Sequence, residues 1–472
     1  MSEMTSRALY RNGITPSPSI PGSSRVGQLF IIPLGGFVVL ATAPWWTSAL
    51  LFNGFDTDWT GFFLVPVFVL VTLALALRVS KGDPVLRWAL PLGILLKVVA
   101  AAANLYIFSR FYGRTADFVL YYGAGVELSQ RFQATGHLAF YEPLWSSNLL
   151  RNLMGCLFIL TGPCMSAAMV LFALLGFWGQ YFLYRAFCIA FPGGDRRLFA
   201  MLLFLLPSLV FWPSAVGKDA LILLFLGISV YGFARILQSP TVRPLLTCGI
   251  GLLGVMMVRP HIAGMVALAF AASYLLGRNI SGLSGTLRKF LVVPLLLAAT
   301  FYVVNRAKSF VAVEDVSRAS EVLERVARNS RMGGSAFTPG SATTGLLTAP
   351  FLFFRPFPWE ANSIQAGLAS LEGLLLLFLL WRRRREFLAA LWHSRANPFV
   401  LFVLVYTTQF LLVFSLAINN FGLLARQRVM GIPMVAMLMY TGLQLQSRAR
   451  VPSVAAKAAP RTAPGGARTR RA

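Results

Sequence analysis

Long apolar runs alternate with short polar connections along most of this chain. A helix that crosses a lipid bilayer needs about 20 predominantly apolar residues. The runs that approach this length lie at about 27–52, 60–77, 89–109, 165–187, 198–212, 219–235, 245–258, 262–276, 290–304, 364–381, 398–418 and 429–445. The pattern predicts an all-α, polytopic helical membrane protein with about 12 transmembrane helices.

The basic residues in the polar connections predict which way these helices run. If the N-terminus is cytoplasmic, every strongly basic connection falls on the cytoplasmic side, as the positive-inside rule requires. These connections are 78–88, 188–197, 236–244, 277–289 and 382–397. We therefore expect both termini to be cytoplasmic, with a disordered leader at 1–26, a transmembrane domain at 27–445 and a basic, disordered tail at 446–472.

Two of the connections that then face outward are long, 110–164 and 305–363. The apolar positions that recur at helical spacing in the first loop are Val119, Tyr122, Val126 and Leu128. A similar pattern covers 313–326 in the second loop, so each loop is expected to contain a helix at the membrane surface. Long loops on a compact bundle are uncommon unless they are functional. The outer face is therefore predicted to be the working face.

The composition narrows the range of partners. Hydrophobic residues make up 57% of the chain and charged residues only 12%, which excludes an ordinary soluble domain. A formal net charge of +26 would suggest nucleic-acid binding in a soluble protein. Here most cations lie in the connections and the tail, where they meet anionic lipid headgroups. We expect membrane lipids as partners and no nucleic acid.

Cysteine and histidine show no signature of a metal site. The four cysteines lack a CxxC spacing, and the three histidines are scattered singly along the chain. Cys156 and Cys164 alone could share a compartment, and packing is favoured over a disulfide between them. No metal site and no cofactor is predicted, although a divalent cation is left open.

Cations at the outer face depart from the charge pattern of the rest of the chain. Outward connections are usually poor in Lys and Arg, so these cations need a cause, and an anionic ligand is the simplest one. The candidates for binding it are Lys218, Arg259, His261, Arg355, Arg426 and Arg428. Guanidinium groups bind phosphate oxygens in bidentate fashion, which suits a lipid phosphate.

Several of these cations also have a purely structural interpretation. Lys218 precedes Asp219 and could form a local salt bridge with it. Arg259 could snorkel to the membrane interface, and Glu360 could neutralise Arg355. The ligand-binding interpretation therefore requires that the cations converge on one site, and convergence depends on tertiary structure.

Three outward acids are candidates for chemistry. Asp117 begins the amphipathic pattern of the first loop, where a general base could take a proton from a sugar hydroxyl. Asp is also a favoured residue for capping a helix N-terminus, and the two roles are compatible. Asp56 and Asp58, in GFDTDW, are spaced to share a divalent cation, or are simply solvated.

The stretch TADFVLYYGAGVELSQRFQATGHLAFYEP, continuing through LLRNLMGCLFILTGP, has an acid followed by tyrosines, an amphipathic segment and a Gly-Pro step into the next apolar run. It resembles the first long outer loop of membrane glycosyltransferases of the GT-C superfamily, over roughly 110–190. ARQRVMGIP is similar to the Arg-rich motif before a late helix in these enzymes and in polysaccharide polymerases. The resemblance implies that Asp117 is the base and that Arg426 or Arg428 binds lipid phosphate.

The resemblance also implies an activity and a location. The protein would transfer a sugar from a polyprenyl-phosphate-linked donor to a cell-envelope glycan or a lipid-linked acceptor, at the outer face of a bacterial cytoplasmic (inner) membrane. Two features depart from the family pattern: the long loop follows the third apolar run, and Asp117 has no adjacent acid. Asp56 and Asp58 therefore stay candidates for the acidic role.

Two other functions fit parts of the sequence. A Wzy-like polymerase or ligase of lipid-linked oligosaccharides would depend on arginine and histidine rather than on a carboxylate. A transporter or flippase of anionic lipid-linked sugars would place ionisable residues inside several spans. Lys97 is the clear residue of this kind, and its amine could instead snorkel to the inner surface.

Overall fold

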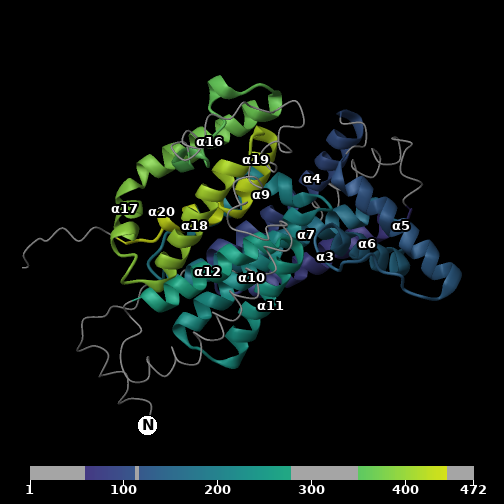
Figure 1. Cartoon of the computed structure of the whole chain (residues 1–472), viewed down its shortest axis with the longest axis horizontal. Helices are drawn as coiled ribbons and strands as arrows, with labels where there is room; N and C mark the ends of the chain where they lie inside the picture. Colours follow the sequence, from purple (N-terminus) through teal and green to yellow (C-terminus); the bar gives the residue numbers. More distant parts are fainter. Residues whose placement is uncertain (1–58, 112–115, 278–348, 444–472) are drawn as a thin grey trace, which may run out of the picture.

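The computed structural model describes residues 59–111, 116–277 and 349–443, and regular structure in these ranges is entirely helical (Figure 1). The earlier elements are α3 (Trp59–Val79), α4 (Pro84–Phe111), α5 (Asp117–Thr135), α6 (Ser147–Thr161), α7 (Met165–Ala190), α8 (Arg196–Leu205), α9 (Pro207–Phe211), η2 (Trp212–Ser214), α10 (Lys218–Gln238), α11 (Val242–Val258) and α12 (Pro260–Leu276). The later elements are η4 (Ala349–Phe351), η5 (Pro358–Glu360), α16 (Ile364–Arg382), α17 (Arg384–Trp392), α18 (Pro398–Ala417), α19 (Phe421–Gln427), η6 (Arg428–Met430) and α20 (Ile432–Met439).

The predicted all-α class is confirmed for the part of the chain that the structure describes. Five helices there are long and apolar enough to cross a membrane, namely α4, α7, α10, α16 and α18. The bent pair formed by α8 with α9 and η2 would make a sixth, while α11 and α12 are apolar but shorter. The chain therefore has five or six helices that are able to span a membrane among its described residues.

One predicted span is shorter in the structure. In place of an apolar helix over 429–445, α20 comprises eight residues, which is about 12 Å of helix and too little to cross a bilayer. The predicted runs at 27–52 and 290–304 lie outside the described residues, as do the leader, the tail and the helix expected at 313–326.

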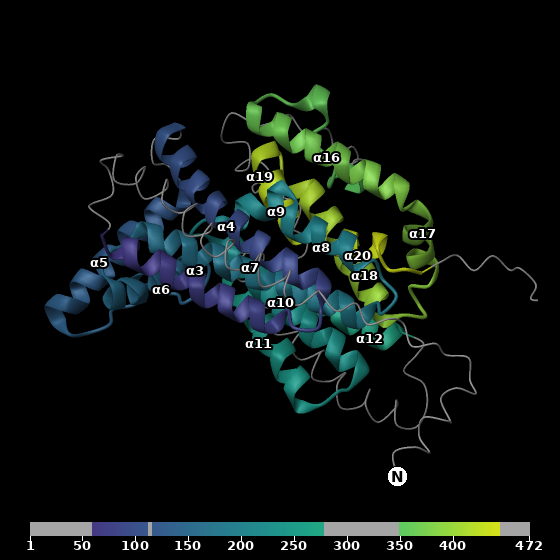
Figure 2. The same ribbon diagram turned by 180° about the vertical axis from the view of Figure 1, so that it is seen from behind.

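The centre of the bundle depends on close contacts between backbones. In Figures 1 and 2, α7 and α10 lie in the middle of the molecule, and α10 also packs against α11. A Cβ atom added to Gly227 of α10 would come within 2.3 Å of the carbonyl oxygen of Gly179 in α7. Small residues are common where helices cross in membranes. Lipid tails are as apolar as the helix surfaces, so the hydrophobic effect does not drive the helices together and close packing must do so.

The helix broken at Pro207 is fixed by polar side chains from α4. Its two parts, α8 and α9 with η2, meet at an angle of 59°. The Lys97 amine donates hydrogen bonds to the carbonyl oxygens of Leu209, at 2.8 Å, and Val210, at 3.3 Å. Asn104, two turns further along α4, donates to the carbonyl of Phe211 at 2.8 Å. Lys97 therefore does not snorkel to the inner surface, because it satisfies backbone groups exposed by the break.

Helices α5 and α6 form an antiparallel hairpin at one end of the molecule, and α17 lies toward the other end (Figures 1 and 2). The helix predicted in the first outer loop is thus present. Its buried positions are Phe118, Tyr121, Gly125, Leu128 and Ser129, whereas most of the predicted apolar positions are half-buried. The difference arises because Gly125 lets α6 approach closely: an added Cβ would lie 2.7 Å from Met154.

An ion network joins helices at the end where α17 lies. The Arg383 guanidinium contacts Asp195 Oδ2 at 2.9 Å and Glu386 Oε1 at 2.5 Å. Asp195 also caps α8 by accepting a hydrogen bond from the backbone of Leu198. The connections 188–197 and 382–397 therefore meet through the ion pair between Arg383 and Asp195.

Candidate functional site

A pocket of about 230 Å³ opens at the end of the bundle where α5 begins. Its walls come from the end of α4, the start of α5, the connection between η2 and α10, and α19. The residues that line it are Asn104, Phe108, Ala116, Asp117, Phe118, Trp212, Ala215, Val216, Gly217, Asp219 and Arg426. It thus combines an aromatic wall with three charged side chains from three different helices.

The Arg426 guanidinium links two carboxylates in this pocket. Its Nη1 lies 3.0 Å from Asp117 Oδ2, and its Nε donates a hydrogen bond to Asp219 Oδ2. Burial alone would lower the pKa of Arg426, but the nearby charges of Asp219 and Asp117 outweigh burial and raise that pKa. Arg426 is therefore a permanent cation between two acids from α5 and α10.

Asp219 also holds a second arginine. Arg259, at the junction of α11 and α12, donates from Nη2 to Asp219 Oδ1 at 2.8 Å and from Nη1 to the side-chain oxygen of Gln427. Both the Asp219 and the Arg259 side chains are buried. The snorkelling interpretation of Arg259 is therefore wrong, because its guanidinium points into the protein and is paired there.

Lys218 does not pair with Asp219, the next residue in the chain. Its amine donates a hydrogen bond to Ser146 Oγ at 2.9 Å. The backbone N–H of Ser146 in turn donates to the carbonyl of Met257, which ties the start of α6 to the end of α11. The local salt bridge with Asp219 is therefore not formed, since Asp219 is occupied by the two arginines.

Asp117 is the first residue of α5, but its carboxylate does not cap the helix. Ala116 occupies the capping position, without any side-chain hydrogen bond, while the Asp117 carboxylate contacts Arg426. Tyr121 follows one turn later and is buried. Burial raises the pKa of Tyr121, against the opposing effect of its hydrogen bond with Ser147. Its hydroxyl therefore stays protonated beside the charged cluster.

Three of the predicted arginines, Arg259, Arg355 and Arg428, do not line the pocket. Arg355 pairs with Glu360, with Nη2 2.6 Å from Oε1, as the structural interpretation expected. Arg428 is fully buried and donates from Nη1 to the carbonyl oxygens of Phe353 and Arg355, at 2.8 and 3.0 Å. Arg426 lies in α19 and Arg428 begins η6, and their guanidinium groups contact different partners.

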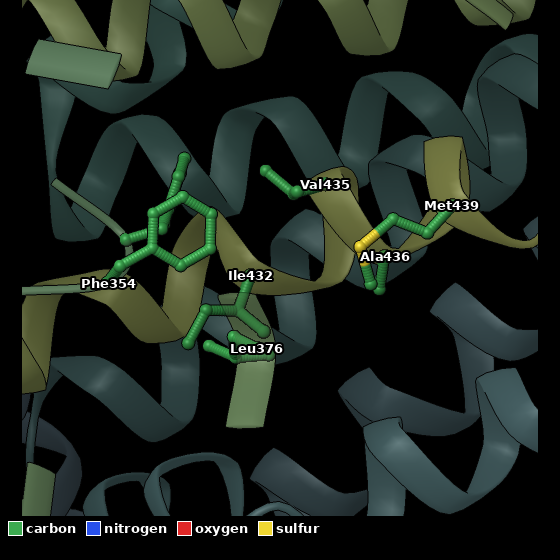
Figure 3. A pocket seen from close by; sticks show the side chains of 7 residues that line it. Phe354, Leu376, Ile432, Val435, Ala436 and Met439 are labelled. Carbon is green, nitrogen blue, oxygen red and sulfur yellow. The ribbon is translucent and has the colours of Figure 1, made fainter. Parts of the chain in front are cut away.

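The surroundings of Arg428 are buried and leave no room for a ligand beside its guanidinium group. Its Nη2 lies 3.6 Å from Glu372 Oε1 of α16, and Glu372 Oε2 accepts a hydrogen bond from the backbone N–H of Ser208 at 2.7 Å. Next to this cluster an apolar cavity of about 10 Å³ lies among Phe354, Leu376, Ile432 and other hydrophobic residues (Figure 3). It has room for about one water molecule and offers no polar group to a ligand.

The other predicted site residues divide as follows. His261 is half-buried in the first turn of α12 and does not line the pocket. Asp56 and Asp58 lie outside the described residues. Among the residues that are described, no group of three or more His, Cys, Asp or Glu side chains is placed to hold a metal ion.

The sequence-based reasoning missed the central role of Asp219. It entered only as a local partner for Lys218, although it is the acid that holds both Arg259 and Arg426. A signal was available in the sequence. An acid at a break between two apolar runs has little access to solvent, so its charge needs a cation as a partner. Asn104 was also missed, because an amide inside an apolar run carries no motif.

In comparisons with protein-family models, curated proteins and solved structures, no match to this chain was found.

Proposed function

We propose that this chain is a membrane glycosyltransferase that uses a lipid-linked sugar phosphate. The observation that carries the proposal is the pocket in which Arg426 joins Asp117 and Asp219. A carboxylate that is 52% exposed, as Asp117 is, can take a proton from an acceptor hydroxyl. A guanidinium beside it can stabilise the charge that develops on a phosphate leaving group.

The proposed reaction uses these groups in one displacement. The acceptor hydroxyl gives its proton to the Asp117 carboxylate while its oxygen forms a bond to the anomeric carbon of the donor sugar. The bond from that carbon to the phosphate oxygen breaks, and polyprenyl phosphate leaves with the electron pair. Arg426 offsets the charge of the leaving phosphate, while Asp219 and Arg259 hold Arg426 in position.

The dimensions and the lining of the pocket support a single headgroup as ligand. A volume of about 230 Å³ is below the roughly 300–1,000 Å³ of sites for drug-sized ligands. Phe108, Phe118 and Trp212 offer apolar surface to the C–H face of a sugar or to the first isoprene unit. One sugar phosphate suits this space better than an oligosaccharide does.

The proposal includes a membrane topology. About 12 spans with cytoplasmic termini would put the pocket at the outer face of a bacterial cytoplasmic membrane. Nucleotide sugars are cytoplasmic, so an outward site favours a polyprenyl-phosphate-linked donor and an envelope glycan or lipid-linked acceptor. In support, the pocket lies at the α5–α6 end of the bundle, while the Arg383 network lies near α17.

The alternative functions receive less support. A polymerase that depends on arginine and histidine would use Arg259, His261, Arg355, Arg426 and Arg428, and of these only Arg426 is among the described residues that line the pocket. A transporter would need ionisable groups along a path through the bundle. Lys97 is held by backbone carbonyls, which makes it a structural residue.

The decisive experiment is a transfer assay with Asp117→Asn. Purified full-length protein would be incubated with a radiolabelled polyprenyl-phosphate sugar and membrane acceptor. The variant is expected to lose about 100-fold or more in rate, the usual contribution of a general base. Glu127→Gln is the matched control, because Glu127 lies on the same helix, is 50% exposed and pairs with Arg131 away from the pocket.

Two results would contradict the proposal. Near-normal transfer by Asp117→Asn would exclude this residue as the base. Activity that survives Asp117→Asn but is lost in Arg259→Ala would favour the polymerase mechanism instead.

A further inference from the structure

The two carboxylates on Arg426 are held with very different strength. The Asp219 side chain is 5% exposed and is bound by Arg259 as well as by Arg426. The Asp117 side chain is 52% exposed, and Arg426 is its one ion-pair partner among the described residues. Exposed ion pairs contribute little to stability, whereas separating a buried pair is costly. A ligand that competes for Arg426 would therefore displace Asp117 and leave Asp219 in place.

The net positive charge around Arg426 increases when Asp117 moves away from it. Lys218, Arg259 and Arg426 carry three positive charges, and Asp117 and Asp219 carry two negative charges, so the group has a net charge of +1 (3 − 2). Without Asp117 at Arg426, the remaining four groups have a net charge of +2 (3 − 1). This surplus favours a phosphate anion: the phosphodiester of the proposed donor carries one negative charge, and the departing polyprenyl phosphate, a monoester, carries nearly two near neutral pH.

The pocket also gives such an anion access to Arg426. Gly217 lines the pocket beside the guanidinium, and a Cβ atom added there would lie 3.7 Å from Nη2. Because glycine has no side chain, this edge of the guanidinium is not covered by residue 217. An anion that took Nη1 from Asp117 could therefore also reach Nη2, which gives the two-point contact that guanidinium groups form with phosphate.

We infer that Asp117 is an internal competitor for a phosphate-bearing ligand at Arg426. Ligand binding breaks the Asp117–Arg426 ion pair, and the freed carboxylate is then available to act as a base. This inference rests on the proposed function in one respect, the use of a phosphate-bearing ligand. It adds that the base is engaged with Arg426 until the phosphate arrives, which would limit unproductive chemistry without a donor.

Binding measurements on the purified full-length protein in detergent test the competition directly. The probes are farnesyl phosphate, inorganic phosphate and farnesol, measured by isothermal titration calorimetry. Asp117→Asn is expected to bind farnesyl phosphate about three- to tenfold more tightly than the unmodified protein, because it removes the competing charge. Arg426→Gln is expected to lose this binding, and Glu127→Gln to leave it unchanged.

The three probes also separate the sources of the phosphate. Binding of farnesyl phosphate without binding of inorganic phosphate would identify a lipid headgroup, and equal binding of both would identify a free phosphate. Either result supports the inference if Asp117→Asn binds that phosphate probe more tightly than the unmodified protein does. Farnesol is expected not to bind, and farnesol binding that matches farnesyl phosphate and survives Arg426→Gln would overturn the inference.

The inference and the proposed function fail in different ways. Unchanged or weaker binding of phosphate probes by Asp117→Asn, including a complete absence of binding, overturns the competition. Tighter binding by Asp117→Asn together with near-normal sugar transfer overturns the catalytic role of Asp117 but leaves the competition intact. Thermal unfolding of each variant shows that the comparison is made on folded protein.

Discussion

Arg426 and Arg428 are two positions apart in the chain and lie in opposite environments. The Arg426 side chain is 26% exposed, lines a pocket of about 230 Å³ and pairs with carboxylates from α5 and α10. Arg428 is fully buried, donates to backbone carbonyls, and neighbours an apolar cavity of about 10 Å³. Both regions contain an arginine side chain, but only the region around Arg426 also contains space for a ligand.

The difference distinguishes the arginine that we propose binds a ligand from an arginine that holds the fold together. The partner Asp117 is a half-exposed side chain that a ligand can replace, whereas the carbonyls of Phe353 and Arg355 belong to the fold and cannot be replaced. A buried arginine also fixes its neighbours, since a guanidinium without partners in a low-dielectric interior is costly. Arg428 therefore joins the segment before η5 to α16 and α19.

The largest loss of stability is expected from Arg428→Ala. The substitution leaves Glu372 as an uncompensated charge, frees two backbone carbonyls and opens a cavity, so we expect a loss of about 3–5 kcal/mol. Thermal unfolding in detergent and the yield of monodisperse protein measure this effect. Unfolding at the temperature of the unmodified protein would show that the cluster is not structural.

A coupling of about 1–3 kcal/mol is expected between Arg428 and Glu372. Replacing both with Met removes the charges together, so the double variant should be less destabilised than the sum of the single variants. The hydrogen bond from Ser208 N–H to Glu372 is still lost in the double variant, so recovery should be incomplete. Strictly additive effects in a double-mutant cycle would contradict the ion pair.

A smaller effect on the fold, of about 1 kcal/mol, is expected from Arg426→Gln. Asp219 keeps Arg259 as a partner, and Asp117 is half-exposed and can be solvated. Sugar transfer should nevertheless fall by about 100-fold or more, because the substitution removes the group that we propose stabilises the leaving phosphate. If Arg426→Gln destabilised the protein as much as Arg428→Ala, the contrast between the two arginines would fail.

The smallest effect on the fold is expected from Gly217→Ala, below about 0.5 kcal/mol. The backbone at Gly217 is extended, with φ of −177°, and an added Cβ makes only ordinary van der Waals contact with Arg426. Gly217→Val, which fills more of the pocket, should weaken farnesyl phosphate binding while unfolding near the normal temperature. Equal binding by the two variants would show that the ligand does not enter beside Gly217.

Much of the helical fold follows from the sequence because long apolar runs permit few alternatives in a membrane. Within the described residues, the run predicted at 165–187 is α7 (Met165–Ala190), and the run at 219–235 is α10 (Lys218–Gln238). The helix in the first outer loop follows from the spacing of its apolar residues, but its close contact with α6 does not. Pattern reasoning counts large apolar residues, whereas the close approach of α6 is set by Gly125.

The sequence by itself determined the all-helical class, with helices apolar enough to span a membrane, and the presence of Asp117, Arg259 and Arg426 beside apolar runs, because hydropathy and charge are properties of each residue. Only the tertiary structure decided which of these groups meet. The 59° break before α10 and the turn of α19 bring Asp219 against both arginines and direct Arg428 away from them. Which of these side chains meet depends on how helices far apart in the chain pack against one another.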